Sequence, residues 1–154
     1  MPHHMPTHSE NRHLPYQAQQ MYDLVADVAR YPEFLPWCAA ARVRRTFARD
    51  AATIMEADLV ISFKVFRERF GSRVTLRPGE TRIETEYLDG PFKYLKSEWR
   101  FTASNGGCEV SFFVDFEFRN AILQKVIGLV FNEAMQRIVG AFEARAAQLY
   151  GPMA

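Results

Sequence analysis

A long alternation of apolar and polar side chains constrains the fold of this chain most. From about residue 39 to residue 118 the alternation has a period of two. Turn signals interrupt it at Arg49-Asp50, Pro78-Gly79, Asp89-Gly90-Pro91 and Asn105-Gly106-Gly107. Period-two alternation is typical of half-buried strands, and such residues favour turns. We therefore predict about six antiparallel strands in an amphipathic, curved sheet.

A long helical segment follows the alternating region, from about Asn120 to Tyr150. Asn120 is a favourable N-cap residue, and Gly151 and Pro152 are typical of a helix end. At 1.5 Å per residue the helix would be roughly 45 Å long, which exceeds what is needed merely to cover the sheet. We expect Gly128 and Gly140, inside this helix, to reflect close packing or clearance for a ligand. The predicted apolar stripe comprises Leu123, Val126, Ile127, Val130, Ala134, Ile138, Val139 and Phe142.

The N-terminal part of the chain predicts a short helix and a broken connection. Met21, Leu24, Val25 and Val28 follow helical spacing, which indicates a helix from about residue 17 to residue 29. The two prolines of YPEFLPWC then favour a turn or a very short helix over residues 31–38, here called the proline loop. A weak alternation before Pro15 is consistent with a seventh strand.

A bent sheet that grips a long helix leaves a cavity where the two layers do not fully interdigitate. Small-molecule pockets are mostly apolar and contain a few polar groups, and the predicted inner face of the sheet supplies both kinds of side chain. The polar ones are Ser72, Thr85, Tyr87, Ser97 and, at the rim, Glu68. The alternative, which the pattern alone favours, is a dry core filled by the aromatic rings.

Five sequence blocks resemble the coenzyme-Q-binding START-like family of the polyketide cyclase and lipid-transport superfamily. They are QMYDLVADVARYPEFLPWC, SFKVFRERFGSRVTL, DGPFKYLKSEWRF, VSFFVDFEFRN and AFEARAAQLYG, in the family's order. The resemblance implies an α+β helix-grip fold, in which a curved antiparallel sheet of six to seven strands wraps around a long C-terminal helix. On this basis we expect a flexible N-terminus over residues 1–8 and one START-like lipid-binding domain over residues 9–151.

The resemblance also implies a function without enzymatic activity. The family binds and delivers ubiquinone or a related polyprenyl lipid in support of respiratory electron transport, and this hydrophobic molecule is a bound ligand rather than a cofactor. The motif positions Tyr31, Pro32, Phe34, Leu35, Pro36 and Trp37 would form part of the cavity mouth, or alternatively a loop that packs on the core. The expected ligand-binding residues are Tyr31, Phe34, Leu35, Trp37, Phe70, Val74, Tyr87, Trp99, Phe101, Phe112, Phe116, Val126 and Val130.

One branch of the same family resembles a bacterial toxin that associates with the large ribosomal subunit and blocks subunit joining. A cationic surface would serve such binding. The alternation places seven arginines on the outer face of the sheet, here called the arginine face: Arg42, Arg44, Arg45, Arg67, Arg69, Arg73 and Arg77. Glu84 and Glu86 on the next strand are expected to pair with these arginines, which favours a solvated, ion-paired surface. The sequence leaves both branches open.

Composition and segment patterns narrow the cellular setting. The net charge of +1 provides no overall field for DNA. Two cysteines without a C-x-x-C motif favour a reducing compartment. The first thirteen residues lack the apolar core of a signal peptide, and no apolar run is long enough to span a membrane. We therefore expect a cytoplasmic protein that makes transient contact with the inner face of the cell membrane through Phe34, Leu35 and Trp37.

Catalytic and metal-binding patterns are weak in this sequence. The four histidines, at positions 3, 4, 8 and 13, are irregularly spaced, and we expect a disordered start rather than a metal site. The strongest candidates for catalysis are Cys38, Cys108, His13 and Glu68, whose spacing matches no known catalytic device. The sequence therefore predicts a binding protein with no catalytic residues.

Overall fold

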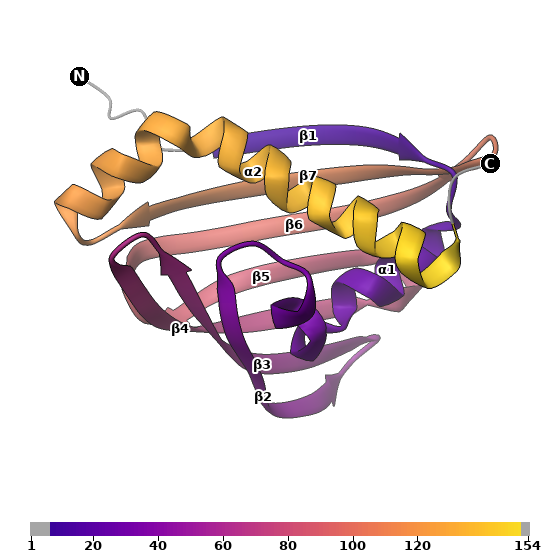
Figure 1. The fold of residues 1–154 in the computed structure, drawn as a ribbon. Coiled ribbons are helices and arrows are strands. Elements are labelled where there is room, and N and C mark those ends of the chain that lie inside the picture. Colours follow the sequence, from indigo (N-terminus) through magenta and orange to yellow (C-terminus); the bar gives the residue numbers. More distant parts are fainter. Residues whose placement is uncertain (1–6, 152–154) are drawn as a thin grey trace, which may run out of the picture.

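The computed structural model describes residues 7–151, in which one antiparallel sheet curves around a long helix (Figure 1). The sheet order is β1-β7-β6-β5-β4-β3-β2. Its strands are β1 (Thr7–Leu14), β2 (Cys38–Arg49), β3 (Ala52–Phe63), β4 (Phe66–Arg77), β5 (Arg82–Asp89), β6 (Phe92–Ser104) and β7 (Gly107–Phe118). The helices are α1 (Ala18–Ala26) and α2 (Ala121–Tyr150), with 3₁₀ turns η1 (Val28–Glu33) and η2 (Pro78–Glu80). The predicted α+β helix-grip fold is confirmed.

The weak alternation before Pro15 forms the first strand of the sheet. β1 pairs antiparallel with β7, so that Leu14 lies opposite Cys108 and Thr7 lies opposite Asp115. Thr7 and His8 therefore belong to a strand, although we expected them in the flexible terminus 1–8. Residues 1–6 of that prediction lie outside the described residues.

The first helix is shorter than predicted. It ends at Ala26, Asp27 leaves helical dihedrals, and the chain continues as η1, whose six residues include Pro32. Val28 is buried from η1, just as Met21 and Leu24 are buried from α1. Over a single turn, α and 3₁₀ geometry place residues on nearly the same face. Val28 therefore keeps the apolar spacing of the helix, although the α-helix itself ends at Ala26.

Helix α2 begins and ends where the sequence predicts. The Asn120 side chain accepts hydrogen bonds from the backbone N–H groups of Ile122 and Leu123 at 2.9 and 3.0 Å, and Gly151 follows the last turn with a positive φ of 97°. A side chain at Gly128 would meet nothing within 4 Å, so close packing does not explain this glycine. The buried side of α2 comprises Leu123, Ile127, Phe131, Ala134, Met135, Val139, Phe142 and Ala146.

The arginine face is ion-paired, mainly with partners other than those predicted. Asp58 of β3 pairs with Arg44 and Arg69, at 2.6 and 2.5 Å. Glu56, also on β3, pairs with Arg45 and Arg73. Of the two acids expected from β5, Glu84 pairs with Arg77 at 2.5 Å. For Glu86, no ion pair is found among the described residues. The pairing is therefore mostly between β2, β3 and β4.

Candidate functional site

A cavity of about 260 Å³ lies between the concave face of the sheet and α2. Its walls are formed by the inner faces of β3 to β7, by α2, and by η1 with the proline loop. The dry-core alternative therefore does not describe this structure. The volume is close to the lower end of the range of about 300–1,000 Å³ that is usual for small-molecule pockets.

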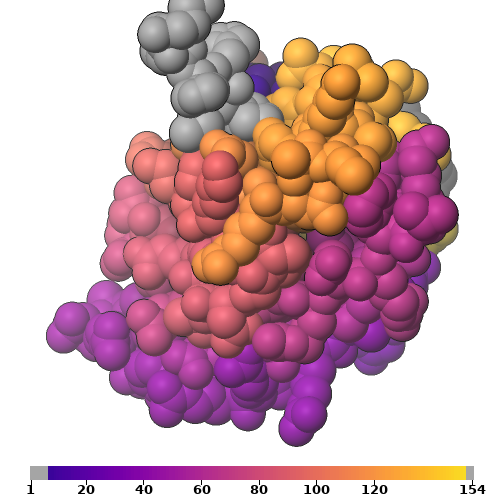
Figure 2. Space-filling model, turned by 90° about the vertical axis from the view of Figure 1, so that its left-hand side faces the viewer, coloured from indigo at the N-terminus to yellow at the C-terminus, as the bar shows by residue number. Residues whose placement is uncertain are grey.

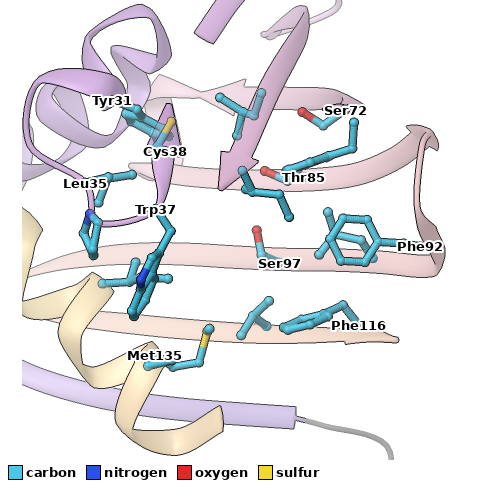
Figure 3. A pocket seen from close by; sticks show the side chains of 18 of the residues that line it. Tyr31, Leu35, Trp37, Cys38, Ser72, Thr85, Phe92, Ser97, Phe116 and Met135 are labelled. Carbon is cyan, nitrogen blue, oxygen red and sulfur yellow. The ribbon is translucent and has the colours of Figure 1, made fainter. Parts of the chain in front are cut away.

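Most of the expected ligand-binding residues line this cavity. The sheet contributes aromatic and branched side chains, and the proline loop contributes a second group on the opposite side (Figure 3). The expected residues that line the cavity are Tyr31, Leu35, Trp37, Phe70, Val74, Trp99, Phe112 and Phe116. Pro36 of the predicted mouth lines it as well.

Three expected aromatic residues are instead used for packing around the cavity. Phe34 turns its ring against Phe142, with 5.3 Å between centroids. Phe101 is fully buried and lies parallel to the ring of Trp99 at 6.0 Å. The Tyr87 hydroxyl accepts a hydrogen bond from the backbone N–H of Phe92 at 3.1 Å. None of the three is among the lining residues.

The two expected helical residues lie outside the cavity. Val126 is half-buried and Val130 is exposed, on the side of α2 that faces away from the sheet. The first half of α2 is apolar on both sides, so that periodicity did not distinguish the inner side from the outer side. The residues of α2 that line the cavity are Leu123, Ile127, Ala134, Met135, Ile138 and Phe142.

The sequence interpretation also missed part of the sheet wall. Leu59, Ile61 and Phe63 of β3 line the cavity, as do Phe92 and Leu95 of β6. In β3 the alternation was present, with Asp58 and Ser62 on the outer face, but Val60 on that face weakened it. Phe92 follows Gly90 and Pro91, where a turn is expected rather than a wall residue.

An aromatic cluster closes one end of the cavity. Phe92 lies at its centre, with centroid distances of 5.1 Å to Phe70, 5.5 Å to Phe116 and 4.5 Å to Phe118. In Figure 3, Phe92 and Phe116 lie on the side away from Trp37 and Leu35. The cavity therefore extends from the proline loop to a wall of phenylalanine rings.

Trp37, in the proline loop, contacts both β3 of the sheet and helix α2. Its carbonyl accepts a hydrogen bond from the Ser62 N–H at 2.8 Å, and its ring meets Phe63 edge to face at 5.6 Å. The guanidinium of Arg137, on α2, lies 5.3 Å from the centroid of the Trp37 ring. Trp37 has a positive φ of 64°, a backbone conformation that costs an L-residue roughly 1–2 kcal/mol. These contacts hold the indole in place despite that cost.

Two titratable groups at the loop side of the cavity, Cys38 and Tyr31, are neutral near pH 7. Burial raises the pKa of the Cys38 thiol to about 11, and a thiol must ionise to act as a nucleophile. Burial also raises the pKa of Tyr31, whose hydroxyl donates to the Val25 carbonyl. Glu68 lines the cavity too.

The remaining candidates for catalysis are not assembled with these groups. Cys108 is fully buried and does not line the cavity. His13 is at the surface, where its ring contacts Glu109 and Ser104. Within residues 7–151, no group of three or more His, Cys, Asp or Glu side chains is arranged to hold a metal ion.

Residues 14–143 match the sequence model of the family described as polyketide cyclase / dehydrase and lipid transport. The chain belongs to this family. Its fold is thus a START-like, lipid-binding fold. Among the described residues, no helix is both long enough and apolar enough to cross a bilayer.

Within this family, the chain is similar to proteins with different names, including a ribosome association toxin and a coenzyme Q-binding protein. It is 40% identical over 139 residues to the ribosome association toxin RatA of Rickettsia prowazekii, covering 88% of this chain and 92% of the relative. It is 32% identical over 149 residues to the mitochondrial coenzyme Q-binding protein COQ10 homolog B of Xenopus laevis, covering 94% of this chain and 59% of the relative.

Solved structures that resemble this chain share the same architecture. An 18 kDa protein of Caulobacter crescentus superposes with a TM-score of 0.80 at 33% identity, over 96% of this chain and 99% of that chain. The Zhui aromatase/cyclase from Streptomyces sp. R1128 has a TM-score of 0.78 at 16% identity, over 97% of this chain and all of that chain (100%). At that identity, the likeness to the cyclase concerns the fold alone.

Proposed function

We propose that this protein binds ubiquinone or a related polyprenyl quinone in its cavity and delivers it without chemical change. The observation that carries the proposal is the cavity itself, whose walls are nearly all aliphatic and aromatic and include a few hydroxyl groups. The similarity to a coenzyme Q-binding protein supports the same ligand class. On this proposal no cofactor is required.

The size of the cavity favours a ring and a short length of isoprenoid tail. Each buried methylene contributes about 0.8 kcal/mol, so that a few isoprene units outweigh the cost of ordering the ligand. A cavity of about 260 Å³ is too small for a long polyprenyl chain. We infer that the rest of a long tail extends out of the protein and remains in a lipid phase.

The proposal of a non-enzymatic role rests on the side chains at the cavity. A thiol with a pKa of about 11 is protonated at neutral pH, and Cys38 therefore lacks the ionised form needed for attack. His13 and Cys108 do not line the cavity, and Glu68 is the one carboxylate among the described residues that does. A cyclase would need a base and an orienting group positioned on its substrate.

Mass spectrometry of an organic extract of natively purified protein tests the ligand class. We expect an isoprenoid quinone in the extract, and saturable uptake of a short-tailed ubiquinone by the stripped protein. If the native extract contains no isoprenoid and the stripped protein takes up no quinone, the proposal is wrong. Turnover of the added quinone to a new product would contradict the non-enzymatic role.

Association with the large ribosomal subunit is the second candidate, favoured by the 40% identity to a ribosome association toxin. Most of the arginine face is already engaged in ion pairs with acidic residues of β3 and β5. Arg42 and Arg67 are exposed and form no ion pair among residues 7–151. This candidate expects salt-sensitive co-sedimentation with large subunits that is lost on changing both arginines to Glu. Co-sedimentation that the double change leaves intact would remove the arginine face as the contact.

A further inference from the structure

Three hydroxyl groups form a row across the floor of the cavity. Ser72, Thr85 and Ser97 lie on the adjacent strands β4, β5 and β6, and all three line the cavity. Thr85 pairs directly with Ser97 on one side and with Val74 on the other, and Ser72 lies two residues before Val74 on β4. In Figure 3 the three oxygens lie between the proline loop on one side and Phe92 and Phe116 on the other. We call this set the hydroxyl row.

The three hydroxyls of the hydroxyl row are not used to hold the described fold together. Ser72 is buried, whereas Thr85 and Ser97 are half-buried, and no hydrogen bond from any of the three hydroxyls to another protein group is found within residues 7–151. A buried hydroxyl without a partner costs roughly 1–3 kcal/mol. None of the three oxygens is among the fully buried unpaired atoms of residues 7–151, so they are open to the cavity. A guest that covered them would incur this cost unless it carried polar atoms to bond to them.

We propose that the hydroxyl row binds the oxygen atoms of the quinone ring, so that the ring enters first and the tail points toward the proline loop. This inference rests on the proposed function and adds the orientation of the ligand. A hydroxyl can donate to a carbonyl or an ether oxygen, and a quinone ring carries such oxygens around its edge. The aromatic wall around Phe92 then receives the flat ring, and the aliphatic residues near Leu35 receive the tail.

The hydroxyl row explains why a polar head can reach the middle of an apolar cavity. Directly paired residues on adjacent antiparallel strands have Cβ atoms about 4.5–5.5 Å apart, so Thr85 and Ser97 can contact the same ring. Ser72 is the diagonal neighbour of Thr85 and reaches a further position. A ligand without ring oxygens would leave all three hydroxyls unsatisfied.

Two probes that differ only in the ring test this orientation. One is a short-tailed ubiquinone, and the other carries the same tail on an oxygen-free benzene ring. Each of Ser72→Ala, Thr85→Val and Ser97→Ala is expected to weaken quinone binding about two- to tenfold, and to leave binding of the oxygen-free probe unchanged or tighter. Thr75→Val, whose side chain is outside the cavity lining, is the matched control for Thr85→Val and should change neither affinity.

The outcomes separate this inference from the proposed function. Infrared spectra should place the carbonyl stretch of bound quinone at lower frequency in the wild-type protein than in the triple variant, because a hydrogen bond weakens the carbonyl. Quinone binding that survives the triple change, or equal losses for both probes, overturns the inference alone. If the wild-type protein binds neither probe, the proposed function fails and the inference fails with it. Thermal unfolding by circular dichroism checks that each variant is folded.

A different observation concerns the outer surface next to the cavity. Val65, at the β3–β4 turn, is 91% exposed, and Ile122 and Leu129 of α2 are 70% and 80% exposed. Val126 and Val130 lie on the same outer side of the helix. In Figure 2 the first half of α2, in orange, lies beside the chain around the β3–β4 turn, in magenta. We call these five side chains the outer apolar patch.

The charges around the patch are mainly positive. Lys64 adjoins Val65, and Lys125 and Arg137 are exposed on α2, against one exposed acid on this stretch, Glu133. The inner sides of the same two segments line the cavity, through Phe63 and Phe66 from the hairpin and Leu123 and Ile127 from the helix. The patch and this part of the cavity therefore lie on opposite sides of the same two segments.

We propose that the outer apolar patch docks on the surface of an anionic lipid bilayer. Exposed apolar side chains interleaved with cations are typical of segments that lie in the membrane interface. This placement differs from the contact through Phe34, Leu35 and Trp37 that the sequence suggested, because those three side chains are half-buried against the core.

Co-flotation with vesicles tests the docking surface. Phosphatidylcholine vesicles with about a quarter phosphatidylglycerol should bind the protein more strongly than pure phosphatidylcholine vesicles do. Val65→Ser and Leu129→Ser together should reduce binding at least fivefold, whereas Leu149→Ser, a 52% exposed residue at the other end of α2, should not. Equal binding by the double variant overturns the proposal. A wild-type dimer that the same double change dissociates also overturns it, since the patch is then an interface between two copies.

Discussion

Trp99 of β6 meets Phe142 of α2 edge to face, with 5.0 Å between the ring centroids. Here the helix contacts the sheet directly, and Phe112 adds a third ring 4.3 Å from Trp99. We predict that Phe142→Ala lowers the free energy of unfolding by about 3–5 kcal/mol, because it removes a fully buried ring from this junction. Phe142→Leu should cost less. Chemical denaturation measures both, and a loss below about 1 kcal/mol for the alanine variant would contradict this role.

Filling the cavity should prevent ligand uptake without unfolding the protein. Ala134 is buried on α2 and lines the cavity. We predict that Ala134→Phe reduces uptake of a short-tailed quinone at least tenfold, because the new ring occupies the ligand's volume. The change in unfolding free energy should stay within about 3 kcal/mol. Val130→Phe, on the outer side of the same helix, is the control and should take up the quinone normally.

The two valines predicted as ligand contacts illustrate where sequence reasoning fails. Turn residues located four of the five hairpins between β2 and β7, and Asn120 and Gly151 located α2. The β3–β4 turn at Lys64 and Val65 was not predicted, because it contains no Gly, Pro, Asn or Asp. Periodicity separates the two sides of a helix only when one side is polar, and the first half of α2 is apolar on both. Val126 and Val130 were therefore assigned to the wrong side. In β3, Leu59 and Ile61 were missed although the signal was present. Asp58 and Ser62 alternate with the inward residues there, and only Val60 interrupts the pattern.

Glu56 should make the stability of the protein sensitive to acid. Hydrogen bonds from Arg45, and then from Arg73, lower its pKa from 4.5 to about 2 in the folded protein, against the opposing effect of desolvation. The unfolded chain therefore takes up the proton first as the pH falls. The stabilisation is complete above about pH 4.5 and is lost as the pH falls through about 2.

We therefore predict that Glu56→Gln is less stable than the wild-type protein near neutral pH, and that the difference disappears near pH 2. Urea denaturation at a series of pH values measures it. Glu86→Gln, which removes a carboxylate that forms no ion pair among the described residues, is the control. A difference between wild type and Glu56→Gln that is independent of pH would contradict this assignment.

Two glycines should respond in opposite ways to the addition of a methyl group. At Gly128 a new Cβ would meet nothing within 4 Å, whereas at Gly107 it would lie 1.9 Å from the carbonyl oxygen of Leu14. We predict that Gly128→Ala raises the free energy of unfolding by about 1 kcal/mol, because alanine is the better helix former. Gly107→Ala should lower it, because β1 and its connection must move. Thermal melting of the two variants tests this, and destabilisation by Gly128→Ala would indicate an unseen contact at this position.

The pairing of β1 with β7 has a consequence for how the protein is made. Each of the strands β2 to β6 pairs with the next strand in the chain, so these hairpins can form one after another as the polypeptide emerges. β1 is synthesised first, yet its partner follows roughly a hundred residues later, and such long-range pairing is slow. α2 comes later still. We expect the nascent chain to keep a half-built, uncovered apolar trough until translation ends, so that a chaperone or a lipid has access to it before the helix covers it.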